Sequence, residues 1–271
     1  MKVCFSSFTC PTWDLTQILT AARDLGYHGV DLRAGAHHNH GVEIDTAPEK
    51  RQALKEEFKL RGIDAVCLST GIQLADPDAL ELIQSRIKLA ADVGFDAIRV
   101  LCGKPEQEMG QSDFIDHIGA TLARAAVLGE RQNVAVWLET HDEMSRAFLA
   151  SAVLRRADHD NAGIVYNTLH PYRMGESVDD TFEALGKNIS YVRFHDGLKD
   201  PGKVVIRPMG QGDLPLDKIF SNLLIAGYNG YLCAEWFHDQ YGTSPVETLK
   251  LYHKEITRLI DNHGAALDFM V

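Results

Sequence analysis

Residues 133–167 read NVAVWLETHDEMSRAFLASAVLRRADHDNAGIVYN and hold one complete repeat of a pattern that runs through the chain. The apolar runs at 133–140 and 162–167 predict two strands, and residues 143–157 between them predict a helix. Strands made of near-continuous apolar runs are typical of a parallel sheet that helices cover on both faces. This strand–helix–strand unit therefore favours an α/β fold with crossover helices.

The same alternation extends outward from this unit to both ends of the chain. Six further strands are expected at 2–8, 28–33, 65–70, 96–102, 189–195 and 231–236. The remaining helices are expected at 14–26, 48–61, 77–93, 112–130, 178–185, 216–226 and 246–263. Eight such units in 271 residues predict a single (β/α)8 TIM barrel that forms one domain over residues 1–271. The alternative is a doubly wound open sheet, but residues 6–11 are not the glycine-rich phosphate loop that such a sheet usually carries.

Composition and charge narrow the functional classes. The formal net charge is −11 without a concentrated basic run, which argues against nucleic acid as a partner and favours small neutral or weakly anionic substrates. No apolar run approaches the roughly 20 residues of a membrane span, and the first residues resemble a strand more than a signal peptide. We therefore expect a cytoplasmic protein without a membrane partner, whose five cysteines are reduced. Assembly into a homo-oligomer stays open.

Polar side chains end four consecutive predicted strands in the second half of the chain. They are Glu139, Asn167, His195 and Glu235, and each directly follows an apolar run. The carboxyl ends of barrel strands meet at one mouth, where catalytic groups of TIM barrels lie. Two carboxylates, a carboxamide and an imidazole predict one divalent metal, Mn²⁺, Mg²⁺, Co²⁺ or Zn²⁺, in open coordination. Arg33 ends the second predicted strand and is a candidate substrate contact.

Five short segments carry a resemblance to a known family. They are LETH at 138–141, YNTLHP at 166–171, FHDG at 194–197, GQGD at 210–213 and AEW at 234–236. With them the chain resembles the xylose isomerase-like barrels, the sugar-phosphate isomerases/epimerases, whose relatives include ketohexose 3-epimerases, hydroxypyruvate isomerase and inosose dehydratase. The resemblance covers nearly the whole chain and is most specific from Glu139 onward.

The resemblance implies roles for individual residues. The four strand-end residues match the family's metal ligands, His170 matches a histidine that contacts substrate oxygens, and Arg207 lies on a loop with a basic substrate contact. The family usually has Asp where this chain has Asn167, and a neutral carboxamide holds a hard cation less firmly.

The implied reaction is proton transfer next to a carbonyl group of a small sugar, sugar phosphate or polyol. A metal ion polarises the carbonyl, and Glu139 and Glu235 remove and return the proton from opposite sides. Epimerisation, isomerisation and an inosose dehydratase-like lyase reaction all stay open. Two further alternatives are an endonuclease IV-type phosphodiesterase, whose Asp-x-His motif is absent at 213–215, and a non-catalytic sugar-binding barrel, which Asn167 favours.

Overall fold

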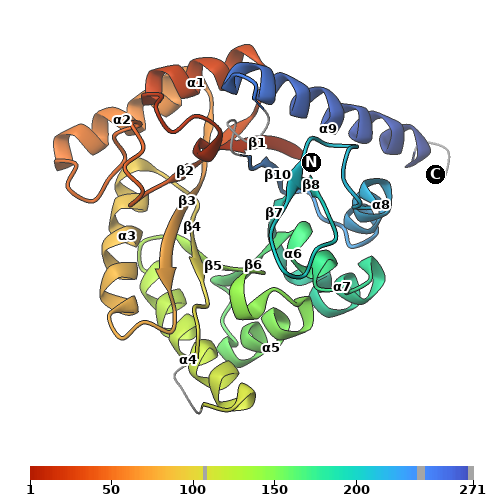
Figure 1. Ribbon diagram of the computed structural model, residues 1–271. Coiled ribbons are helices and arrows are strands. Elements are labelled where there is room, and N and C mark those ends of the chain that lie inside the picture. Colours follow the sequence, from red (N-terminus) through yellow and green to blue (C-terminus); the bar gives the residue numbers. More distant parts are fainter. Residues whose placement is uncertain (106–108, 237–241, 268–271) are drawn as a thin grey trace.

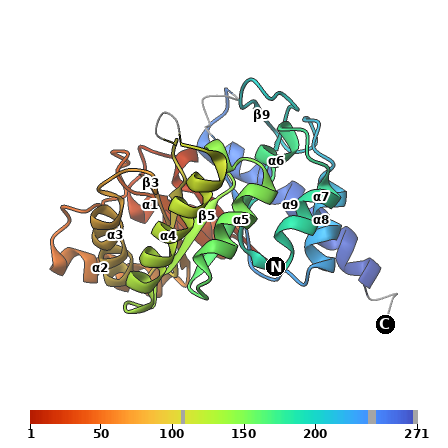
Figure 2. The ribbon, with the colours of Figure 1, turned by 90° about the horizontal axis from the view of Figure 1, so that it is seen from below.

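The computed structural model describes residues 1–105, 109–236 and 242–267 and shows a closed parallel barrel surrounded by helices (Figures 1 and 2). The eight barrel strands are β1 (Lys2–Ser6), β2 (Gly29–Arg33), β3 (Asp64–Gln73), β4 (Ala97–Leu101), β5 (Ala135–Glu139), β6 (Ala162–Asn167), β7 (Ile189–Arg193) and β10 (Tyr231–Ala234). β1 closes the barrel by pairing with both β2 and β10. The predicted (β/α)8 barrel is therefore confirmed.

Helices cover the outside of the barrel (Figure 1). They are α1 (Leu15–Asp24), α2 (Pro48–Arg61), α3 (Ala79–Val93), α4 (Gln111–Glu130), α5 (Ala147–Ala157), α6 (Leu169–Arg173), α7 (Val178–Leu185), α8 (Leu216–Ile225) and α9 (Pro245–Leu267). Short 3₁₀ helices occur at η1 (Ser7–Thr9), η2 (Asp142–Met144) and η3 (Gly186–Asn188). Within the described ranges, no helix combines the length and the apolar character that crossing a membrane requires.

Local sequence signals set several helix ends where they were predicted. The Asp14 carboxylate accepts a hydrogen bond from the Gln17 backbone N–H, and the Gln17 side chain accepts one from Asp14 N–H, which forms a capping box on α1. Gly62 and Gly94 end α2 and α3 in the left-handed conformation, with φ of 65° and 98°. These caps turn the chain back toward the next barrel strand.

The barrel interior away from the site is filled by a small cluster of apolar and thiol side chains. Cys4, Cys67 and Cys233 lie there with Tyr191, whose ring stacks on Trp137 at a centroid distance of 5.5 Å. All five cysteines are free, as expected, and all are buried. This layer closes the barrel beneath the polar residues.

Three predicted strands end two residues earlier than expected, because β1 ends at Ser6 and not at residue 8, and β7 and β10 are shortened in the same way, and one short α-helix was not predicted. β7 ends at Arg193 and β10 at Ala234, so His195 and Glu235 stand just beyond their strands and not within them. α6 follows β6 after one residue, in a stretch where the sequence pattern predicts neither a helix nor a strand. An antiparallel hairpin of β8 (Asp196–Gly197) and β9 (Ile206–Arg207) leaves the barrel after β7 and lies at one of its ends (Figure 2).

Candidate active site

The four strand-end residues meet at the carboxyl-terminal mouth of the barrel, as predicted. Glu139, Asn167, His195 and Glu235 line one cavity of about 320 Å³, and all four are buried. Cavities of this size hold small molecules. The convergence follows from the parallel barrel, because consecutive strands deliver their last residues to the same rim.

Asn167 links its neighbours through both ends of its side-chain amide. Its Nδ2 donates to Glu139 Oε1 at 2.9 Å, and its Oδ1 lies 2.7 Å from His195 Nε2 and accepts from the Leu169 backbone N–H at 3.2 Å. A carboxylate only accepts, so the amide nitrogen must face Glu139. The Oδ1 atom must then accept from His195 Nε2–H, and Nδ1 of the same ring lies 3.3 Å from the Glu235 carbonyl oxygen.

Two buried arginines occupy the same mouth, and the sequence did not identify them. Arg99 on β4 places its Nε 3.0 Å from Glu139 Oε2, and Arg193 on β7 places its Nε 3.7 Å from the same oxygen. Arg193 also pairs through Nη1 with Glu235 Oε1. Both glutamates are therefore neutralised by guanidinium groups.

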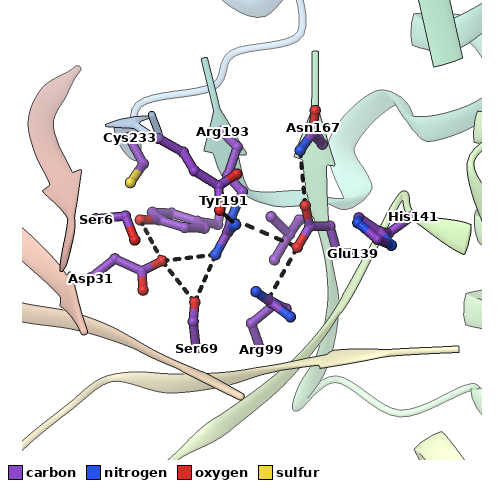
Figure 3. A network of polar contacts seen from close by, with 12 residues as sticks. Ser6, Asp31, Ser69, Arg99, Glu139, His141, Asn167, Tyr191, Arg193 and Cys233 are labelled. Atoms are coloured by element: carbon purple, nitrogen blue, oxygen red, sulfur yellow. Dashed lines mark hydrogen bonds and ion pairs between the residues drawn. The ribbon is translucent and has the colours of Figure 1, made fainter. Parts of the chain in front are cut away.

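A second set of polar groups anchors Arg193 from below (Figure 3). Its Nη2 donates to Ser69 Oγ at 2.7 Å and lies 3.4 Å from Asp31 Oδ2. The same Asp31 oxygen accepts from Ser69 Oγ at 2.9 Å and from the Tyr191 hydroxyl at 3.2 Å. The guanidinium is thus held from several sides, and its position is fixed before any ligand binds.

Burial and the two arginines set the protonation of the site. Burial alone would raise the pKa of Glu139, but the charges of Arg193 and Arg99 outweigh it and hold that pKa below its usual value. Burial, reinforced by the Arg193 charge, lowers the pKa of His195 to about 4. At neutral pH the site therefore combines an ionised Glu139 with a neutral His195.

Two of the three predicted substrate contacts reach this cavity. His170 is buried and lines it, and its Nδ1 accepts from Arg173 Nε at 3.1 Å, so the ring proton lies on Nε2. Arg33 lines the cavity as well, and burial together with repulsion from Arg99 and Arg193 lowers its pKa to about 10. Arg207 is exposed and lines a neighbouring cavity of about 490 Å³ instead.

The hairpin loop beyond β7 is tied to the barrel by Asp196. Its buried carboxylate accepts hydrogen bonds from the backbone N–H groups of Gly197, Gly210, Gly212 and Leu214, at 2.8 to 3.3 Å. The tied segment brings Val204 and Ile206 to the cavity. It also directs Arg207 toward the neighbouring cavity, which explains why that residue is absent from the mouth.

The donors at the mouth do not fit a divalent ion as they are arranged. Both lone pairs of Asn167 Oδ1 are used by His195 and Leu169, and Glu139 and Glu235 face guanidinium groups. Among the described residues, no group of three His, Cys, Asp or Glu side chains could hold a metal ion. Metal binding by the four residues stays a prediction.

A parallel barrel with polar groups gathered at the carboxyl ends of its strands is the architecture of TIM-barrel proteins with a site at that face. Residues 19–261 match the profile of the family described as xylose isomerase-like TIM barrel, so the chain belongs to this family.

Two curated relatives are inosose isomerases from Bacillus species. The one from Bacillus licheniformis is 25% identical over 74% of this chain and 66% of its own length, just under two thirds of that protein. The one from Bacillus velezensis is 22% identical over 96% and 97% of the two chains. The crystal structure of the IolI protein with a bound zinc atom superimposes with a TM-score of 0.82 at 18% identity, covering 97% of this chain and 99% of that one. This last similarity shows the shared fold.

Proposed function

We propose that the protein is an isomerase or epimerase that moves a proton next to the carbonyl group of a small sugar, sugar phosphate or polyol-derived ketone. One observation carries the proposal: two buried carboxylates, Glu139 and Glu235, converge on one cavity at the mouth of the barrel. Membership of the family and similarity to two inosose isomerases support the same reaction class. Cyclic ketones of the inosose type are therefore the first substrates to test.

The two glutamates supply the proton-transfer groups of this reaction. Glu139 is ionised at neutral pH, as a proton acceptor must be, and Glu235 enters the cavity just beyond the end of β10, which β6 and β7 separate from β5. One carboxylate takes the proton from the carbon next to the carbonyl, and an enediolate forms. Return of a proton to the opposite face of that carbon gives an epimer, and return to the neighbouring carbon gives an isomer.

Two further side chains are suited to hold the hydroxyl groups of such a substrate. His170 is neutral because burial lowers its pKa well below the usual value, and its Nε2 carries the proton that a hydroxyl oxygen accepts. Arg33 stays charged and half-buried at the rim, where it can bind hydroxyls or the phosphate of a sugar phosphate. Neither role requires a metal ion, and no step of this proposal uses one.

Solvent deuterium exchange tests the proposal directly. Purified protein is incubated in D₂O with inososes, ketohexoses and their phosphates, and NMR follows loss of the C–H signal and formation of new isomers. Incorporation next to a carbonyl, with an epimer or isomer as product, is the expected result. Formation of an unsaturated product identifies a lyase instead, and absence of exchange in every class contradicts the proposal.

Matched variants connect the exchange to the two carboxylates. Glu139→Gln and Glu235→Gln keep the side-chain shape but remove the proton acceptor, so each is expected to lower the exchange rate by about 10²-fold or more. Glu183→Gln, on the exposed surface of α7, is the control and keeps the native rate. Circular dichroism checks that each variant is folded. A folded Glu235→Gln variant with near-native exchange would remove Glu235 from the proposed role.

A further inference from the structure

We propose that Arg193 takes the place of a catalytic metal ion, so that its guanidinium stabilises the enediolate in a metal-independent reaction. The inference deepens the proposed function and rests on it for the identity of the intermediate. Arg193 lines the cavity, contacts both glutamates and is only 2% exposed. A positive charge therefore already lies between the two groups that are proposed to move the proton.

The position of Arg193 follows from strand geometry. It precedes His195 by two residues, and alternate residues of a strand point to the same face. β7 therefore directs Tyr191 and Arg193 toward the barrel axis, and His195, two residues beyond Arg193, lines the same cavity as Arg193. The contacts of Arg193 with Ser69, Asp31 and Glu235 come from three other strands, so the guanidinium lies near the axis itself.

The charges of the mouth balance without a cation. Three buried carboxylates, Asp31, Glu139 and Glu235, face the guanidinium groups of Arg99 and Arg193 at the centre and Arg33 at the rim. A divalent ion would add two positive charges to a buried space that already holds its own counter-charges. Repulsion from the arginines disfavours such an ion, because like charges interact strongly in a poorly solvated interior.

Three buried polar atoms at the mouth lack an aligned hydrogen bond within the described part of the chain. They are Arg193 Nε, Arg99 Nε and Glu139 Oε2, which approach one another as ion pairs without hydrogen-bond geometry. A substrate satisfies all three when its carbonyl oxygen accepts from the guanidinium N–H groups and a hydroxyl donates to Glu139. Donors fixed in advance at a developing negative charge are the usual means of stabilising it.

The resulting step balances without any further reactant. The C–H proton passes to a glutamate carboxylate, the C–H electron pair forms the carbon–carbon double bond, and the carbonyl π pair moves to oxygen. The guanidinium holds the anionic oxygen until the proton returns from a carboxylic acid. No atom is gained or lost, and the product is an isomer of the substrate.

Metal affinity in the absence of substrate provides the first test. Isothermal titration with Mn²⁺ compares the native protein with the double variant Arg193→Leu/Asn167→Asp, which removes the guanidinium and supplies the missing carboxylate. We expect negligible binding to the native protein and at least a tenfold tighter Mn²⁺ affinity in the double variant. If the double variant does not fold, the native titration alone decides, since stoichiometric Mn²⁺ binding at micromolar affinity overturns the inference.

Catalysis after removal of metal provides the second test. Native protein dialysed against EDTA is expected to keep its exchange rate within twofold, and Arg193→Lys is expected to retain more activity than Arg193→Met. Loss of activity with EDTA and recovery with Mn²⁺ refutes the role of Arg193 but leaves the proposed function intact. Failure of every substrate to exchange contradicts the proposed function, while the titration still reports whether a metal site exists.

Discussion

Asn167→Asp is the substitution whose effect the structure specifies most closely. The native Nδ2 donates to Glu139 Oε1 at 2.9 Å, so the variant places a second carboxyl oxygen at that short distance from a carboxylate. Two full charges at this separation repel by about 6 kcal/mol at an effective dielectric constant of about 20. We therefore expect the introduced carboxyl group to keep a proton and to donate it to Glu139.

The cost of keeping that proton depends on pH. In the unfolded chain the new group has a pKa of about 3.9, and each pH unit above this value adds about 1.4 kcal/mol to the cost of folding with the proton bound. The free energy of unfolding can therefore fall by at most about 1.5 kcal/mol at pH 5 and about 4 kcal/mol at pH 7. The pKa of the introduced carboxyl group is higher in the folded protein than in the unfolded chain. Stability is therefore lost as pH rises from about 4, the unfolded pKa, toward the folded pKa. Attraction to Arg99 and Arg193 reduces the loss, and we expect about 2–4 kcal/mol at pH 7.

Urea unfolding at these two pH values, followed by circular dichroism, measures the difference from the native protein. Asn229→Asp is the control, because Asn229 is exposed and its side chain faces the amino terminus, so the same change should leave stability nearly unchanged. An Asn167→Asp variant as stable as the native protein at pH 7 would refute the reasoning. The reasoning would also be wrong if the variant lost equal stability at pH 5 and pH 7, or if Mn²⁺ restored the stability of the variant fully.

Three further predictions concern other parts of the molecule. Asp196→Asn removes the charge that binds four backbone N–H groups, and we expect faster hydrogen–deuterium exchange in residues 196–214 and a loss of about 1.5–3 kcal/mol. Burial lowers the pKa of His40 to about 4, so folding stability falls as pH drops from about 6.5 to 4, and His40→Gln should reduce this loss by at least about 1 kcal/mol in acid titrations. All five cysteines are buried, and burial raises the pKa of Cys102 to about 12, so Ellman's reagent should label the native protein at least about 100-fold more slowly than the protein in urea.

Much of the fold could be predicted because the barrel repeats one local pattern. Asp14, Gly62 and Gly94 mark helix ends through rules that act over a few residues, and the structure has the corresponding caps. The four strand-end residues were found in the same way, since a polar residue after an apolar run marks the rim of a parallel barrel. Such signals require no knowledge of which strands lie opposite one another.

The arginines were missed because they lie inside the predicted strands 96–102 and 189–195, although in the structure β7 ends at Arg193 itself. Arg99 and Arg193 are single charges between apolar neighbours, and their partners lie up to 162 residues away along the chain. The available signal was the alternation of strand residues, which places Arg193 on the face of His195. Arg207 was predicted to contact the substrate but lies outside the mouth. The direction of its side chain depends on the hydrogen bonds by which Asp196 holds the irregular loop, and no short sequence pattern reports these bonds.

Asn167 and Arg193 together give a consistent electrostatic account of the mouth. Relative to the aspartate that the family resemblance implies at this position, Asn167 removes one negative charge, and Arg193 adds one positive charge at the same mouth. The two features shift the local charge by as much as one divalent ion would. Restoring the aspartate alone leaves Arg193 in the ion's place, and removing Arg193 alone leaves Asn167 Oδ1 occupied by its two hydrogen bonds. A metal site is therefore expected only when both residues change, which is why the double variant, and neither single one, distinguishes the two mechanisms.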